Sequence, residues 1–233
     1  MPLYEALARY SYLRAYREVD STPDIERFLT RVIGIGEIAL GYKDATFVRL
    51  GTSLEEELDD LPEHLGKNIA ALTVYPATRL RVTLFERFAP PEPKVNRLFS
   101  RVLERVTDHE VGNATLSLTS SRIEVSNTPE FVGQGEECAL VLDAGNCTDT
   151  LINNAKTLHD YVASTGPGSE IAGHYQSLEA LSVPFGRLPR NATPEQKEDF
   201  QNRASRQLPA HGLEITVGPI EWDAKIRPPL RKH

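Results

Sequence analysis

The chain has 233 residues, of which 40% are hydrophobic and 25% are charged, and its formal net charge is −7. This length suits one large domain or two small lobes, with a core that needs no disulfide bonds. No apolar stretch approaches the roughly 20 residues of a transmembrane helix, so a membrane span is excluded. The acidic balance argues against broad, non-specific nucleic-acid binding, which needs a basic surface. No apolar signal segment begins the chain, and we expect a cytoplasmic protein without membrane contacts.

Residues 1–43 are predicted to form an N-terminal helical extension. Residues 4–19 are interpreted as a first helix. Thr22-Pro23 supplies an N-cap and a proline at the first helical position, and apolar residues at helical spacing continue to Ile33. Glycines then weaken this second helix and end it near Gly41. The aromatic residues of the extension suit a protein interface; they are Tyr4, Tyr10, Tyr12 and Tyr16.

Residues 44–222 are predicted to form the main domain, in which strands and helices alternate. The strands expected in its first half are residues 45–50, 69–75 and 79–88, the last from the alternating sequence RLRVTLFERF. The acidic run between residues 55 and 63 is typical of a solvated helix face. After a proline-rich break, apolar residues from Val95 to Val106 predict an amphipathic helix.

The second half of this domain shows the same alternation. Extended segments are expected at residues 114–125, as a strand or a hairpin, and at 137–143, 178–188 and 212–222. Thr148 or Asp149 is expected to cap a helix that reaches Val162. A capping box at 193–196 starts another helix. Residues 223–233, rich in proline and basic side chains, are predicted to be a loose C-terminal tail.

The order of these elements resembles the two-histidine (2H) phosphoesterases, a family that includes the 2'-5' RNA ligase-like proteins. The C-terminal half carries the match, through the segments ECALVLD, SVPFGRLP, TPEQKEDFQNRASRQLP and GLEITVGPIEW. The resemblance implies an α+β fold with two lobes, in which antiparallel sheets surround a central groove and helices lie outside.

Each lobe of that family contributes one His-x-Thr/Ser motif, and both histidines are replaced here. RVTLF at residues 81–85 is similar to the first motif, with Arg81 in place of the histidine and Thr83 retained. In the second, Ser182 stands in place of the histidine and Pro184 in place of the Thr/Ser. The chain therefore resembles a degenerate member of the family.

These replacements change the expected chemistry. The family uses one histidine as general base and the other as general acid on a phosphodiester. A guanidinium stays protonated, so Arg81 cannot act as a base, and Ser182 cannot do so unaided. Arg81, Thr83, Ser182 and Arg187 are instead predicted to bind a phosphate, because guanidinium and hydroxyl groups donate hydrogen bonds to its oxygens. The alternative is that Arg81 faces solvent on an alternating strand.

His174 is a weak candidate for a displaced catalytic group, because it lies eight residues before Ser182. The histidines show no HxH, HxxxH or HExxH spacing, and the spacing of Cys138 and Cys147 fits no zinc motif. We therefore expect no metal and no cofactor, and two reduced thiols.

Three functions remain open from the sequence. The first is a non-catalytic or divergent 2H-like protein that binds a nucleotide or the phosphate of an RNA end. The second is an active phosphodiesterase that hydrolyses 2',3'-cyclic or 2'-5' linkages with displaced catalytic residues. The third is an assembly protein that binds a partner through its N-terminal helices.

Overall fold

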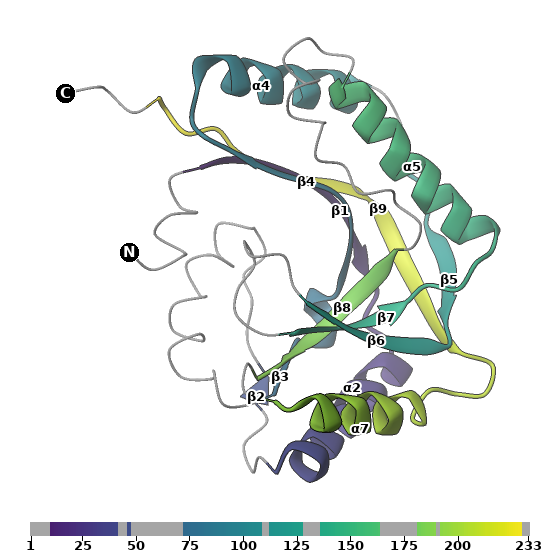
Figure 1. Cartoon of the computed structure of the whole chain (residues 1–233). Coiled ribbons are helices and arrows are strands. Elements are labelled where there is room, and N and C mark those ends of the chain that lie inside the picture. Colours follow the sequence, from purple (N-terminus) through teal and green to yellow (C-terminus); the bar gives the residue numbers. More distant parts are fainter. Residues whose placement is uncertain are drawn as a thin grey trace.

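The structure of the chain is a computed structural model, which describes residues 10–41, 46–47, 72–108, 112–127, 136–163, 181–189 and 192–229. Two sheets form its framework (Figure 1). Sheet A has the order β4-β1-β9-β5, with β1 (Ser11–Val19), β4 (Arg81–Ala89), β5 (Leu116–Ser120) and β9 (Leu213–Lys225). Sheet B has the order β2-β3-β8-β7-β6, with β2 (Thr46–Phe47), β3 (Thr73–Val74), β6 (Arg122–Asn127), β7 (Glu136–Val141) and β8 (Ser182–Leu188). All pairings are antiparallel except that of β2 with β3.

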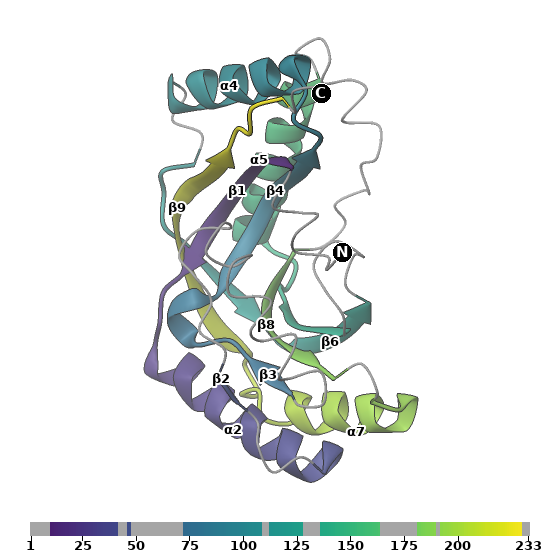
Figure 2. The same ribbon diagram turned by 90° about the vertical axis from the view of Figure 1, so that its left-hand side faces the viewer.

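Helices cover the outer sides of these sheets (Figures 1 and 2). Helices α4 (Pro93–Asp108) and α5 (Asn146–Ala163) pack on sheet A, where they contact β1 and β4. Helices α2 (Pro23–Leu40) and α7 (Pro194–Ser205) contact each other, and α7 also contacts β6 of sheet B. A short 3-10 helix, η1 (Ala77–Arg79), leads into β4. The predicted α+β fold class, with antiparallel sheets and external helices, is confirmed.

One hydrophobic core joins the two sheets. Its buried side chains come from both sheets and from the helices that cover them. Phe28 of α2 packs edge to face on Phe185 of β8, with ring centroids 5.4 Å apart and planes at 83°. Phe99 of α4 is fully buried on the other side of the molecule. No helix within the described residues is long and apolar enough to cross a bilayer.

The prediction of a helix at residues 4–19 is wrong over residues 11–19, which form β1. This strand pairs with β4 on one side and with β9 on the other, so it lies inside sheet A. All its residues except Glu18 are buried. Tyr12 and Tyr16 are therefore buried in the sheet and do not form an exposed interface; Tyr4 lies outside the described residues.

Local capping signals were predicted correctly at two helices. In α2, the Thr22 hydroxyl accepts a hydrogen bond from the Ile25 N–H, at 3.3 Å, and Pro23 occupies the first turn. The helix ends at Gly41, whose φ of 70° is a left-handed conformation that glycine adopts at little cost. In α7, Thr193 and Gln196 form the predicted capping box. Helix α5, by contrast, begins at Asn146 and not after Thr148 or Asp149.

Residues 114–125 do not form a hairpin, because β5 and β6 belong to different sheets. Ser121 alone connects them, and its N–H and hydroxyl both donate to Asp143 Oδ1, at 3.2 and 2.8 Å. The chain thus passes from sheet A to sheet B at this residue, and each sheet combines strands from both halves of the sequence.

The predicted domain boundaries at 43/44 and 222/223 stay predictions, although two neighbouring elements differ from expectation. Residues 11–40 are built into the core through β1 and α2. Strand β9 continues to Lys225, so the first residues of the predicted tail are strand. The Arg227 N–H then donates to Ser11 Oγ at 3.0 Å, and its carbonyl accepts from Asn96 Nδ2 at 2.8 Å. These bonds hold the tail against β1 and α4 as far as residue 227.

Candidate functional site

One face of sheet A carries a continuous set of polar side chains. Residues directly opposite each other in an antiparallel pair project to the same face, and so do residues two apart on one strand. Arg81 lies opposite Glu18, and Thr83 lies opposite Tyr16. The same face continues into β9, where Glu221 lies opposite Tyr16. We call this set the polar face: Arg14, Tyr16, Glu18, Arg81, Thr83, Glu86, Glu221, Asp223 and Lys225.

Helices α4 and α5 pack on the opposite face of sheet A. The residues of β1 and β4 that contact these helices project to the face opposite the polar face. Ser11 Oγ donates to Asn96 Oδ1 of α4 at 2.9 Å, and Arg17 Nη2 donates to Asn154 Oδ1 of α5 at 3.2 Å. The Phe85 ring stacks on His159 of α5, with centroids 4.7 Å apart. The polar face is therefore the side of sheet A that these helices leave uncovered.

Arg81 is buried on the polar face, which contradicts the alternative of a solvent-facing side chain. Only 7% of its surface is exposed. Its guanidinium carbon lies 4.5 Å from the centroid of the Tyr16 ring, a cation–π contact. Its Nη2 lies 3.7 Å from Glu18 Oε1, which is an ion pair beyond ordinary hydrogen-bond distance.

A second arginine reaches the same tyrosine ring. Arg14 Nη2 donates to Asp223 Oδ2 at 2.8 Å, and its guanidinium carbon lies 5.0 Å from the Tyr16 centroid. The Tyr16 hydroxyl donates to Glu221 Oε2 at 3.2 Å. Burial raises the pKa of Tyr16 to about 12, with Arg81 opposing this shift and the carboxylates of Asp223 and Glu221 adding to it. Tyr16 therefore remains a protonated hydrogen-bond donor at neutral pH.

Ser182 and Arg187 lie on β8 in sheet B. Ser182 is opposite Val141, and Arg187 is opposite Glu137. A register shift between Cys138 and Ala139 brings Arg187 onto the same face as Ser182. Both side chains are half-buried, whereas the neighbouring Phe185 points into the core.

Arg187 lies close to the half-buried carboxyl group of Glu137. Burial raises the pKa of Glu137, and the positive charge of Arg187 lowers it in part. On its other side Arg187 is opposite Thr73 of β3. This arginine therefore sits between two strands of sheet B, with Glu137 as its nearby acidic neighbour.

The strands that carry the two motif positions lie beside each other. Strand β4, with Arg81 and Thr83, contacts β8, with Ser182 and Arg187, although they belong to different sheets. The two segments that carry Arg81 and Ser182 are therefore on neighbouring strands. The roles of the four residues in ligand binding stay predictions.

Sequence reasoning missed the part of the polar face that comes from β1 and β9. A helix over residues 4–19, as predicted, does not pair with β4 and so does not place Arg14 and Tyr16 beside Arg81. A signal was present: Leu13, Ala15 and Val19 alternate with polar or aromatic residues at period two, which is typical of a strand. The pairing with Asp223 needs a contact across more than 200 residues, which no local pattern indicates.

The remaining sequence candidates give no second site. His174 lies outside the described residues. Among those that the structure describes, no group of three or more histidine, cysteine, aspartate or glutamate side chains is placed to hold a metal ion. Cys138 is buried and Cys147 is half-buried, and both are free thiols.

His159 is on the helix-covered side of sheet A and cannot reach the polar face. Its imidazole is buried between α5 and Phe85. Burial, together with the positive charge of Arg87, lowers the pKa of His159 from 6.5 to about 3. At neutral pH His159 is therefore an uncharged core residue.

This pKa makes the fold sensitive to acid. The unfolded chain protonates His159 near pH 6.5, whereas the folded chain does so only near pH 3, so its contribution to stability is present above pH 6.5 and is lost as pH falls toward 3. The free energy of unfolding should fall by up to about 1.4 kcal/mol per pH unit in this window. His159→Leu should flatten the dependence in urea unfolding at pH 7.5, 6 and 5. The exposed His211→Leu is the control, and equal slopes in wild type and His159→Leu would contradict the assignment.

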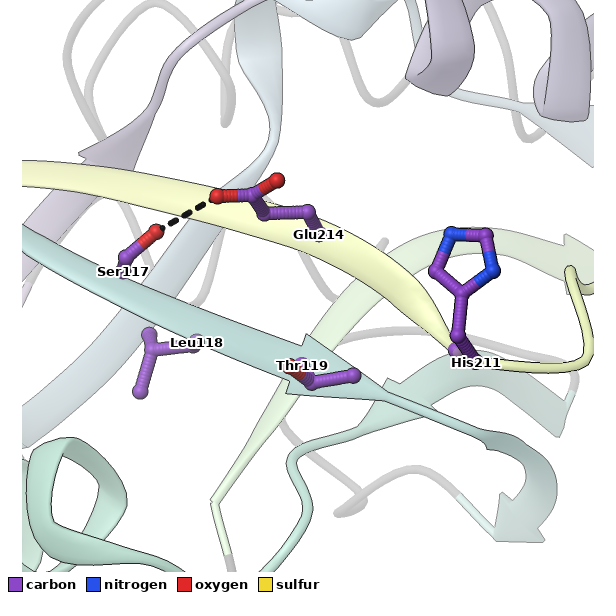
Figure 3. A pocket seen from close by; sticks show the side chains of 6 residues that line it. Ser117, Leu118, Thr119, His211 and Glu214 are labelled. Carbon is purple, nitrogen blue, oxygen red and sulfur yellow. Dashed lines mark hydrogen bonds between the residues drawn. The ribbon is translucent and has the colours of Figure 1, made fainter.

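A shallow surface pocket of about 170 Å³ lies between β5 and the start of β9 (Figure 3). His211, Thr119 and Glu214 line it, and Ser117 Oγ donates to Glu214 Oε1 at 3.0 Å. None of the residues predicted from the sequence lies in it. The pocket holds no buried charge, so the polar face, where two buried guanidinium groups converge, is the better candidate site.

Comparison with known proteins supports the fold. No family model matches the chain, and no curated protein matches it in sequence. Usb1 from Kluyveromyces marxianus has a similar structure, with a TM-score of 0.53 at 12% identity over 92% of this chain and 93% of Usb1. The structure of the same protein with uridine monophosphate gives a TM-score of 0.52 at 11% identity, over 97% of this chain and 96% of that one. At such low identity the similarity shows the fold alone.

Proposed function

We propose that this chain is a degenerate 2H-phosphoesterase-like protein that binds the phosphate of a nucleotide or an RNA end at the polar face. The observation that carries the proposal is the position of Arg81. This buried guanidinium stands in the first motif position of the resemblance, with Thr83 on the same face of β4. The similar fold of Usb1, which has been determined with uridine monophosphate, supports a nucleotide as the ligand.

The charges of the polar face indicate which arginine serves the ligand. Arg14 is neutralised by Asp223 at 2.8 Å, so its strongest donor is already used. Arg81 is 3.7 Å from Glu18, a distance too long for a strong charge-assisted hydrogen bond. Of these two ion pairs that of Arg81 is the longer, so a phosphate oxygen at hydrogen-bond distance would make a closer contact with Arg81 than Glu18 does, and the Thr83 hydroxyl would add a further donor.

Ser182 and Arg187 would bind the ligand from the other side. Their strand β8 contacts β4, and both side chains are half-buried on one face of sheet B. A phosphate held between the two strands would receive donors from both sheets. This is the arrangement that the two motif positions imply, with arginine and serine in place of the histidines.

The same residues do not supply acid–base catalysis. A guanidinium does not give up its proton at neutral pH, and Tyr16, with a pKa raised to about 12, does not act as a base. Each positioned acid or base contributes about 10²–10⁴-fold to a rate, so loss of both predicts very slow turnover. An active phosphodiesterase would need a group outside this set, such as His174.

Two measurements on the purified chain test the proposal. Calorimetric titration with uridine monophosphate and with a short RNA should show binding, and incubation with 2',3'-cyclic nucleotides should show no turnover typical of an enzyme. The absence of binding to both ligands would overturn the proposed function. Turnover that disappears in His174→Ala would favour the enzyme.

A further inference from the structure

Glu18 and Arg81 form an unequal ion pair on the polar face. Only 7% of the Arg81 side chain is exposed, whereas 48% of the Glu18 side chain is exposed, and their closest atoms are 3.7 Å apart. The neighbouring pair of Arg14 and Asp223 is different, because it is closer, at 2.8 Å, and both side chains are largely buried, at 7% and 14% exposure. Glu18 is thus the one carboxylate of these two pairs that is accessible from solvent.

We infer that the Glu18 carboxylate occupies the anion position of Arg81 and is displaced when a phosphate binds there. This inference rests on the proposed function and names the residue that limits the affinity of the same site. The negative charges of a carboxylate and of a phosphate are both attracted by a guanidinium, so the two groups compete for the space beside it. A ligand that arrives from solvent meets the exposed carboxylate of Glu18 before the buried guanidinium of Arg81.

The geometry explains why Glu18 yields and Asp223 does not. Glu18 gives up little when it leaves Arg81, because its carboxylate is half exposed and water solvates it well. At 3.7 Å the Glu18 contact also lacks a direct hydrogen bond. Asp223 makes that bond to Arg14 in a buried setting, where separation of the charges would cost far more.

Inorganic phosphate is the probe for this inference, since it contains the shared chemistry and no base or sugar. Glu18→Gln removes the competing charge and keeps the size of the side chain. We expect phosphate to bind this variant about threefold to fivefold more tightly than wild type, as loss of a weak ion pair with an exposed carboxylate allows. The gain should disappear in the double variant Glu18→Gln/Arg81→Ala. Calorimetric titration and thermal shift in phosphate measure it.

Glu37→Gln is the matched control, because Glu37 is an exposed glutamate on α2 and its loss changes the net charge equally. It should leave phosphate affinity unchanged. Glu18→Ala is the second variant and should show the same gain as Glu18→Gln. Equal phosphate affinities in wild type and both Glu18 variants would overturn the inference.

The result separates this inference from the proposed function. If phosphate binding improves in Glu18→Gln but uridine monophosphate and RNA bind no variant, Glu18 is the competing anion and the nucleotide function is wrong. If uridine monophosphate binds wild type and Arg81→Ala weakens it, but Glu18→Gln changes nothing, the function stands and the role of Glu18 is wrong.

Discussion

Replacing Arg81 by alanine is expected to weaken the binding of uridine monophosphate by at least about tenfold. A charge-assisted hydrogen bond is worth about 1.5–3 kcal/mol, and about 1.4 kcal/mol corresponds to a factor of ten. Arg81→Lys should recover part of this loss, because a lysine keeps the charge but not the planar pair of donors. Calorimetric titration at low and high salt measures the effect, and salt should weaken wild-type binding more than that of Arg81→Ala.

The control for this experiment is Arg101→Ala, which removes the same charge from the exposed surface of α4. It should bind uridine monophosphate as wild type does. Because Arg81 is buried against Tyr16, Arg81→Ala also loses packing, and its thermal unfolding must show that it is folded at the temperature of titration. Equal affinities in wild type and folded Arg81→Ala would remove Arg81 from the site.

Replacing Arg17 by alanine is expected to lower the melting temperature by about 6–12 °C, corresponding to about 3 kcal/mol in a chain of this size. Arg17 is 0% exposed. Its Nη1 donates to the carbonyls of Ala114 and Gly218 at 2.8 and 2.7 Å, and its Nη2 donates to Asn154 Oδ1 at 3.2 Å. Alanine would remove these bonds and leave a cavity between sheet A and α5.

The hydrogen bonds of Arg17 stabilise a positive charge that burial disfavours, since desolvation lowers the pKa of Arg17. Arg17→Met should therefore lose less stability than Arg17→Ala, because it fills the cavity without a charge to compensate. Arg27→Ala is the control: Arg27 is exposed on α2 and pairs with Asp24 in water, so its loss should cost less than about 1 kcal/mol. Thermal and urea unfolding measure all three variants. A wild-type melting temperature in Arg17→Ala would show that its hydrogen bonds do not stabilise the fold.

Gly112 lies against the buried guanidinium of Arg17. A Cβ at this position would lie 2.5 Å from Arg17 Nη2, and its φ of +89° suits glycine. The loop before β5 therefore approaches the buried guanidinium only because residue 112 has no side chain. The hydrogen bond from the Ile220 N–H to the Gly112 carbonyl, at 3.3 Å, also ties this loop to β9.

Elements whose signals are local could be predicted from the sequence. The caps at Thr22 and Thr193 follow from hydrogen bonds within a few residues, and the alternation of β4 places Arg81 and Thr83 on one face whatever the strand pairs with. Such features need no knowledge of distant residues. The order of these elements was also sufficient for the resemblance that predicted the fold class.

The conformation of β1 and the contacts of Arg81 depend on strands that are distant in the sequence. Residues 11–19 become a strand because β4 and β9 pair with them from far along the chain, and these partners are invisible in a local window. The same pairing sets Glu18 and Tyr16 against Arg81, so the arginine is buried in a charged cluster and not exposed to solvent. Burial and charge at the polar face arise from strands brought together by folding, and for that physical reason they could be read only from the structure.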